Sequence, residues 1–226
     1  MDNFESAMQY IETQEATKIS YVKVGEDKKK LIVCFASNQH LGFERKTSLM
    51  KNKYKKNNFD VLYLRNRIGW YLGGLNGIGK NMTHTIAFLR KQFANYDKVL
   101  SVGTSAGGYA SLLFGSLLKV NEVIAINPQT DLQYCIDNMF TDQQAWINLC
   151  NKTESVAWKK YNKIADVLND EVSYSVFYKG SDNCIHSQDI ALHGDYHYDQ
   201  IKHFPSLSKL ETHAEIFSTI HKFVNN

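Results

Sequence analysis

The residues best suited to covalent chemistry are the five from Gly103 to Gly107, which read Gly-Thr-Ser-Ala-Gly. Glycines two positions before and two positions after a serine form the G-x-S-x-G pattern of a nucleophile turn. Such a turn forces the central residue, here Ser105, into a strained backbone conformation that lifts its hydroxyl clear of the sheet. The glycines are required because the incoming strand and the outgoing helix nearly touch. The segment therefore predicts a serine nucleophile.

The pattern gains specificity from the segments on either side of it. Residues 98–102 form a short apolar run typical of a buried strand. Small and apolar residues then repeat at helical spacing, at Ala106, Ala110, Leu113 and Leu117. The amide of Ala106 would begin that helix and face an oxyanion built on Ser105. A phosphate-binding loop is excluded because neither G-x-x-x-x-G-K-[ST] nor G-x-G-x-x-G spacing is present. A glycine-rich turn with an incidental serine is the structural alternative.

Other apolar runs predict the rest of a sheet. They cover residues 18–24, 31–35, 59–64, 122–126 and 172–178, with a last strand near 201–204. Turn-forming residues at 25–28 favour a hairpin between the first two runs. Helical repeats stand at Met82, Ile86, Leu89 and Phe93, and again at Leu210, Ala214, Phe217, Ile220 and Val224. Strands that alternate with helices predict an α/β protein whose mostly parallel central sheet has helices on both faces.

Residues 1–226 are expected to form a single domain, since the chain of 226 residues shows no repeat and no linker. One stretch, 133–169, is longer than a single crossover helix requires. It holds two polar helical patterns, at 136–149 and 156–168. A small helical cap inserted over the carboxyl edge of the sheet and two ordinary packing helices both fit this pattern.

With its serine turn between a strand and a helix, the chain resembles the α/β-hydrolase superfamily over nearly its whole length. The resemblance implies an acid after a later strand and a histidine before the last helix, in the order Ser, Asp or Glu, His. Asp182 follows the run 172–178, and His213 stands at the start of the last helical pattern. The implied catalytic triad is therefore Ser105, Asp182 and His213, and this chemistry needs no cofactor.

Each of the last two assignments has rivals. Asp189 lies seven residues beyond Asp182, and Asp131 follows the earlier run 122–126. For the base, His203 falls in the predicted last strand and His221 inside the last helix. His213 is preferred because only a loop before the helix would let an imidazole reach over the serine.

Loops after two other predicted strands supply the remaining candidates. After 31–35, Ser37 is expected to give the second oxyanion-hole amide, although the His-Gly pair usual in the family is absent there. Asn38 is the next choice for that amide and a candidate for substrate binding. The loop after 59–64 holds further candidate substrate-binding residues, Arg65, Trp70 and Tyr71. It faintly resembles loops of bacterial hydrolases associated with surface-polysaccharide modification. Loop packing is the alternative.

Composition excludes several classes of protein. The chain carries 26 Lys plus Arg against 23 Asp plus Glu, a net charge of +3, without the concentrated excess of a nucleic-acid binder. No apolar run approaches the roughly 20 residues of a membrane span. Acidic residues in positions 1–17 argue against a signal peptide. The four cysteines form no CxxC pair. A reduced, cytoplasmic protein is expected.

A cluster of histidines and aspartates between residues 186 and 203 raises the question of a metal site. It contains no HExxH helix, and the surrounding residues suggest a loop entering a strand. No metal is predicted, and these side chains are expected to face solvent.

Together these features predict a serine hydrolase that cleaves a small acyl ester, such as an O-acetyl group, through an acyl-enzyme on Ser105. His213 would act as general base and Asp182 would orient it. The expected substrate is a small-molecule or saccharide ester, and no nucleic-acid partner is expected. Two alternatives remain. An acyltransferase would pass the same acyl group to a sugar hydroxyl, and an accessory binding protein would keep the fold without turnover.

Overall fold

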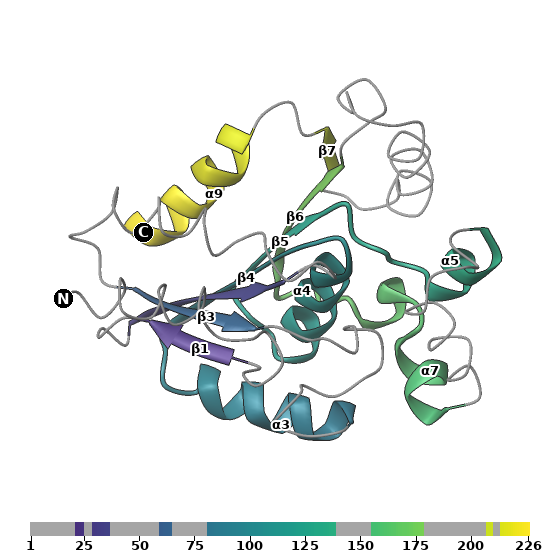
Figure 1. Ribbon diagram of the computed structural model, residues 1–226. Helices are drawn as coiled ribbons and strands as arrows, with labels where there is room; N and C mark the ends of the chain where they lie inside the picture. The colour runs from purple at the N-terminus through teal and green to yellow at the C-terminus, as the bar shows by residue number, and fades with distance from the viewer. Residues whose placement is uncertain are drawn as a thin grey trace, which may run out of the picture.

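The computed structural model describes residues 21–24, 29–36, 59–64, 81–138, 155–178, 207–209 and 213–226, and Figure 1 shows how they are arranged. The strands are β1 (Tyr21–Val24), β2 (Lys30–Phe35), β3 (Asp60–Leu64), β4 (Lys98–Thr104), β5 (Glu122–Ile126), β6 (Ser173–Tyr178) and β7 (Leu207–Lys209). The helices are α3 (Met82–Phe93), α4 (Ala106–Leu117), α5 (Leu132–Asn138), α7 (Val156–Tyr161), the 3-10 helix η1 (Ile164–Val167) and α9 (His213–Asn225).

The described strands form one seven-stranded sheet in the order β1-β3-β2-β4-β5-β6-β7. All neighbours from β3 to β7 run parallel, and only β1 at the edge is antiparallel to its neighbour. The predicted α/β architecture with a mostly parallel central sheet is therefore confirmed.

The predicted hairpin between residues 18–24 and 31–35 is wrong. β1 pairs with β3, with Tyr21 opposite Leu64, while β2 lies between β3 and β4. β2 is buried from Leu31 to Phe35, so both its faces and both its edges are covered. Turn-forming residues at 25–28 predict a reversal of the chain, but they do not decide which strand pairs with which.

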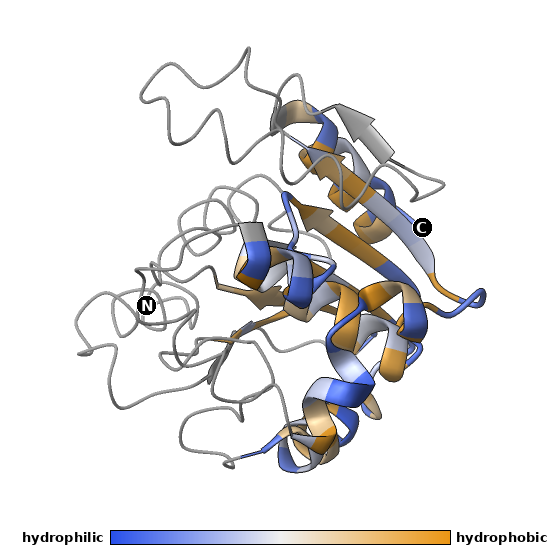
Figure 2. Ribbon diagram, turned by 90° about the vertical axis from the view of Figure 1, so that its right-hand side faces the viewer, coloured by the Kyte–Doolittle hydropathy of each residue, from blue (hydrophilic) through white to orange (hydrophobic). Residues whose placement is uncertain are grey.

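Alternation along β2 divides the core between the two faces of the sheet. Leu31, Val33 and Phe35 belong to one apolar cluster, which includes residues of α3 and α4. Ile32 and Cys34 belong to a second cluster, which includes residues of α9. Figure 1 shows α9 on one side of the sheet and α3 on the other, and Figure 2 shows the apolar character of the strands between them. Helices thus cover both faces, as predicted.

The buried stripe of α9 differs from the predicted one. The buried residues are Ile216, Ile220, Phe223 and Val224. Ala214 is exposed and Phe217 is only partly buried. Ile220 and Val224 are common to the predicted and the observed stripe, and Phe217 packs against the same apolar cluster. The prediction is therefore right toward the carboxyl end of the helix, but it includes the exposed Ala214 and misses Ile216 and Phe223.

Helix α4 is buried along nearly its whole length, from Ala106 to Ser116. Residues of α5, α7 and η1 belong to the same apolar cluster, including Leu132, Cys135, Trp158 and Ile164. The described parts of the 133–169 stretch are thus buried together with α4. A cap over the substrate stays a prediction, because residues 139–154 lie outside the described part of the chain.

One buried hydrogen bond ties α4 to α7. The Tyr109 hydroxyl donates to the Tyr161 carbonyl at 2.9 Å, and Tyr109 is completely buried. Burial raises the pKa of this phenol, so it remains a donor. We expect Tyr109→Phe to lower the free energy of unfolding by about 1–3 kcal/mol, because a buried carbonyl loses its donor. Urea unfolding measures this loss, and unchanged stability would mean that the bond contributes nothing.

A pH-dependent contribution to stability is expected from Glu122, the first residue of β5. Partial burial raises the pKa of its carboxyl group, and Lys98 opposes this more weakly. The folded chain therefore binds more protons than the unfolded chain between the two pKa values, and stability falls as pH rises through that range.

We expect Glu122→Gln to raise the unfolding temperature slightly at pH 7, by an amount equivalent to no more than about 0.5 kcal/mol for this half-exposed group. The gain should disappear in acid, where the native carboxyl is itself neutral. Thermal unfolding at several pH values tests this. Glu171→Gln serves as the control, because that exposed carboxylate pairs with Lys119 at 2.9 Å. A gain that does not depend on pH would contradict the prediction.

Candidate active site

Ser105 lies in the tight turn between β4 and α4. Its backbone angles are φ 53° and ψ −124°, a region that non-glycine residues rarely adopt. Two hydrogen bonds hold this conformation: the Ser105 amide donates to the Ile126 carbonyl at 2.9 Å, and the Ser105 carbonyl accepts from the Tyr109 amide at 3.0 Å. The chain therefore turns in one residue from strand to helix, in the strained geometry expected for a nucleophile.

The glycines around Ser105 are required by close backbone contacts. A Cβ placed on Gly103 would overlap the carbonyl of Gly107 and lie 2.8 Å from the amide nitrogen of Gly108. A Cβ on Gly107 would overlap the Phe35 carbonyl and lie 2.8 Å from the Ala36 oxygen. The strand, the turn and the helix thus pack backbone against backbone, which explains the G-x-S-x-G spacing in physical terms.

The turn lies where the sheet topology favours a binding crevice. β2 continues to β3 on one side, while β4 continues to β5 on the other. Ligands in open α/β sheets bind outside the carboxyl ends of the strands at such a switch point. Phe35 pairs with Gly103 in the register, so both strands end here. The chain order and the turn therefore place Ser105 at the edge where ligands bind in open α/β sheets.

Of the two amides predicted to form an oxyanion hole, those of Ala106 and Ser37, the structure describes only the first. Ala106 is the first residue of α4, so its N–H has no acceptor within the helix and lies at the positive end of the helix dipole. Ala36 donates its amide to the Leu64 carbonyl at 3.0 Å, which fixes the end of β2. Ser37 and Asn38 follow directly but lie outside the described residues. Their predicted roles stay predictions.

Sequence reasoning missed Gln129, a buried side chain that contacts the serine. It follows β5 in the segment Asn127-Pro128-Gln129 and is 2% exposed. Its Nε2 donates to Ser105 Oγ at 3.3 Å. The signal in the sequence was slight: a polar residue just beyond the carboxyl end of the strand next to β4.

Asp131, one of the alternative acids, has another role. Its Oδ1 accepts from the Tyr134 amide at 3.0 Å, and its Oδ2 lies 3.5 Å from Lys163 Nζ. The carboxylate therefore caps the start of α5 and pairs with the segment before η1. Its role as an alternative catalytic acid stays a prediction.

The other candidate triad residues are only partly described. His213 is the first residue of α9, at the predicted start of the last helix, but the position of its side chain is not described. His221 is exposed within α9, and its ring contacts Asn225 of the next turn at 3.0 Å. Asp182, Asp189 and His203 lie outside the described residues.

The substrate-binding candidates Arg65, Trp70 and Tyr71 also lie outside the described residues, as does the histidine cluster at 186–203. Within the described residues no group of three or more His, Cys, Asp or Glu is placed to hold a metal ion. No described helix is long and apolar enough to cross a membrane.

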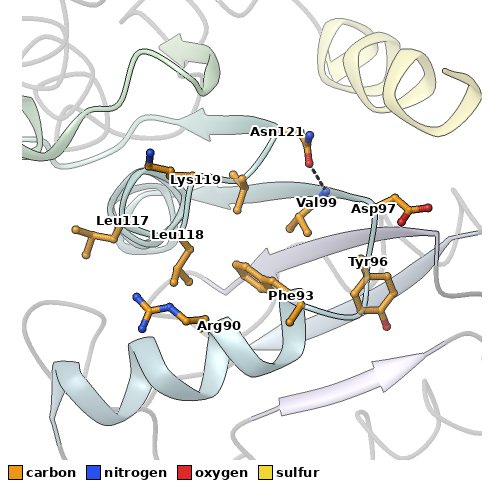
Figure 3. A pocket seen from close by; sticks show the side chains of 11 residues that line it. Arg90, Phe93, Tyr96, Asp97, Val99, Leu117, Leu118, Lys119 and Asn121 are labelled. Carbon is orange, nitrogen blue, oxygen red and sulfur yellow. Dashed lines mark hydrogen bonds between the residues drawn. The ribbon is translucent and has the colours of Figure 1, made fainter.

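A pocket of about 570 Å³ lies at the opposite edge of the sheet from Ser105. Figure 3 shows its lining by α3, the end of α4 and the segments that lead into β4 and β5, including Phe93, Val99, Leu118 and Asn121. Val99 stands near the amino end of β4, whereas Ser105 follows its carboxyl end, so about 20 Å of strand separates them. This pocket is therefore distant from Ser105.

Comparison with solved structures identifies the class of fold. Esterase B from Lactobacillus rhamnosis matches with a TM-score of 0.53 at 10% identity, covering 97% of this chain and 89% of that one. The fluorophosphonate-binding serine hydrolase F of Staphylococcus aureus matches with a TM-score of 0.53 at 13% identity, covering 89% and 84%. A chain of the Gap123 glycosylation-associated protein complex from Streptococcus agalactiae matches with a TM-score of 0.54 at 14% identity, covering 91% and 44%.

These similarities show that the chain has the α/β-hydrolase fold, as its sequence resemblance implied. No family model matches the sequence, and no curated protein is significantly similar to it. The similar solved structures include esterases and serine hydrolases, and Ser105 occupies the strand–helix turn that the G-x-S-x-G pattern predicts.

Proposed function

We propose that the protein is a serine hydrolase that cleaves a small carboxylic ester through an acyl-enzyme on Ser105. The observation that carries the proposal is the φ of 53° at Ser105, held between the end of β4 and the first turn of α4. Such strain persists only when the surrounding structure enforces it, and it clusters at functional sites. The similarity in fold to an esterase and a serine hydrolase supports the same reaction class.

In the proposed reaction, Ser105 Oγ attacks the ester carbonyl while its proton passes to a neutral imidazole, assigned to His213. The negative charge that develops on the carbonyl oxygen is stabilised by the amide of Ala106 and a second amide, assigned to Ser37. The imidazolium returns the proton to the departing alcohol, and water then repeats the sequence on the acyl-enzyme. Asp182 is assigned to orient the imidazole and stabilise its charged form.

The test begins with a fluorophosphonate, which forms a covalent bond only with an activated serine. We expect intact-mass measurement to show one adduct on the folded protein, and peptide mapping to place it on Ser105. Protein unfolded before treatment should give no adduct. Absence of an adduct on well-folded protein would overturn the hydrolase proposal and favour an accessory protein without turnover.

The acyltransferase alternative uses the same acyl-enzyme, so labelling does not separate it from hydrolysis. The similarity in fold to a glycosylation-associated protein gives reason to test a sugar acceptor. Turnover of an acetyl ester is measured with and without a sugar alcohol. If free acetate is the product whether or not the sugar alcohol is present, the result supports hydrolysis. If acetylated sugar forms and the yield of free acetate falls, the proposed reaction becomes acyl transfer.

A further inference from the structure

Gln129 is the described side chain that hydrogen-bonds the serine hydroxyl. It comes from the segment after β5, is 2% exposed, and places its Nε2 at 3.3 Å from Ser105 Oγ. A buried amide beside a nucleophile is costly to desolvate unless it makes hydrogen bonds. The contact between this amide and Ser105 Oγ therefore needs a chemical explanation.

The segment that carries Gln129 is held on three sides. The Asn127 amide donates to the Phe177 carbonyl at 2.8 Å, which joins the segment to the end of β6. Pro128 packs against Gly108 in the first turn of α4. The Thr130 carbonyl accepts from the Ile164 amide at 2.8 Å. The amide of Gln129 is thus built into the fold and does not depend on a bound substrate for its place.

A serine hydroxyl has one hydrogen to donate and two lone pairs to accept with. When one lone pair accepts from the amide of Gln129, the Oγ is held in one rotamer. The hydroxyl hydrogen then points elsewhere, toward a base, and the second lone pair stays available for attack. As that hydrogen leaves, negative charge grows on Oγ, and a hydrogen bond to a charged acceptor strengthens.

We propose that Gln129 is a positioning residue for the nucleophile: its side-chain amide fixes Ser105 Oγ and stabilises the charge that develops on it during attack. This inference rests on the proposed function. Gln129 neither gains nor loses a proton, because the proton of Oγ passes to the imidazole while the bond from Oγ to the carbonyl carbon forms. A neutral donor fits this role, since a carboxylate in its place would repel the developing charge.

The first test is Gln129→Met, which keeps the length of the side chain and removes the donor. We expect kcat for an acetyl ester to fall about 10- to 100-fold, the effect of losing one hydrogen bond to a developing charge. KM should change little, because the lost bond acts on the enzyme's own nucleophile. Fluorophosphonate labelling should slow by a similar factor.

The matched control is Ser116→Ala. Ser116 is also 2% exposed and loses hydrogen bonds to the Leu112 carbonyl and the Tyr174 hydroxyl, but it stands at the far end of α4. We expect its kcat to remain at the wild-type value. Thermal unfolding of both variants separates a loss of stability from a loss of rate.

The second test is Gln129→Glu, which offers a donor only in the protonated state. Burial disfavours a charged carboxyl, so the introduced group should titrate above its ordinary range. The ratio of variant to wild-type kcat should therefore rise as pH falls. A ratio that does not change with pH would contradict the positioning role.

The outcomes separate the two proposals. An inert wild type overturns both the hydrolase function and this inference. An active wild type that loses activity in Ser105→Ala, together with wild-type kcat in a folded Gln129→Met, overturns the positioning role alone. A deficit confined to KM, or a Gln129→Glu ratio that is flat with pH, also overturns it.

Discussion

Replacing Ser105 with alanine is expected to lower kcat for a small acyl ester by about 10⁴- to 10⁶-fold, the range found when an activated nucleophile is removed. Oxyanion donors and substrate binding remain, but no acyl-enzyme can form. Steady-state hydrolysis with product quantified over long incubations measures the residual rate. Fluorophosphonate should leave no adduct on this variant. Residual activity near the wild-type level would remove Ser105 from the mechanism.

A second substitution separates chemistry from backbone strain at this position. Ser105→Gly should be as inactive as Ser105→Ala, because neither variant has a hydroxyl. Glycine adopts a φ of 53° without penalty, whereas alanine retains the strain. We expect Ser105→Gly to be more stable than Ser105→Ala by about 1 kcal/mol, measured by urea unfolding. Equal or lower stability would show that the turn stores no strain.

Replacing Gly103 with alanine is expected to prevent folding or to cost more than about 4 kcal/mol. The added Cβ would overlap the carbonyl of Gly107 and lie 2.8 Å from the Gly108 nitrogen. Both obstacles are backbone atoms, so no side chain can rotate away, and β4 and α4 would have to separate. Circular dichroism with thermal unfolding measures the loss.

The control for steric effects is Gly108→Ala, at the third residue of α4. Its Cβ would meet Pro128 at 3.1 Å, a contact that a small shift relieves. Alanine also favours a helix over glycine by about 1 kcal/mol. We expect the stability of Gly108→Ala to stay within about 1–2 kcal/mol of the wild type. Equal losses at Gly103 and Gly108 would contradict the account of the close contact at the turn.

Much of the sheet could be predicted because its strands are short apolar runs between turns. The run 122–126 coincides with β5, and the run 31–35 differs from β2 by one residue. Pairing was harder. β1 pairs with β3 and not with β2, because strand order depends on how the whole core packs and not on the residues that connect two strands.

The candidate site, like the sheet, was predictable only in part. The strained turn at Ser105 was predictable since its neighbours in sequence carry the geometric requirement: two glycines at fixed spacing in a strand–helix context. Gln129 was not, because it reaches the serine from 24 positions away through the pairing of β4 with β5. Nothing in the local composition marks a glutamine as a partner of a distant hydroxyl. Asp131 shows that position alone is ambiguous: its place after β5 suggested a catalytic acid, and in the structure its carboxylate accepts from the Tyr134 amide at the start of α5.

The burial of α4 from Ala106 to Ser116 has a consequence for the exchange of its backbone amide hydrogens with solvent. A helix covered on all sides cannot open by itself, so its amide hydrogens should exchange with solvent only when the whole domain unfolds. Ser105 is joined to this helix through the Tyr109 amide and therefore belongs to the slowest-exchanging unit. Partial openings of the domain should therefore leave the strained turn at Ser105 intact.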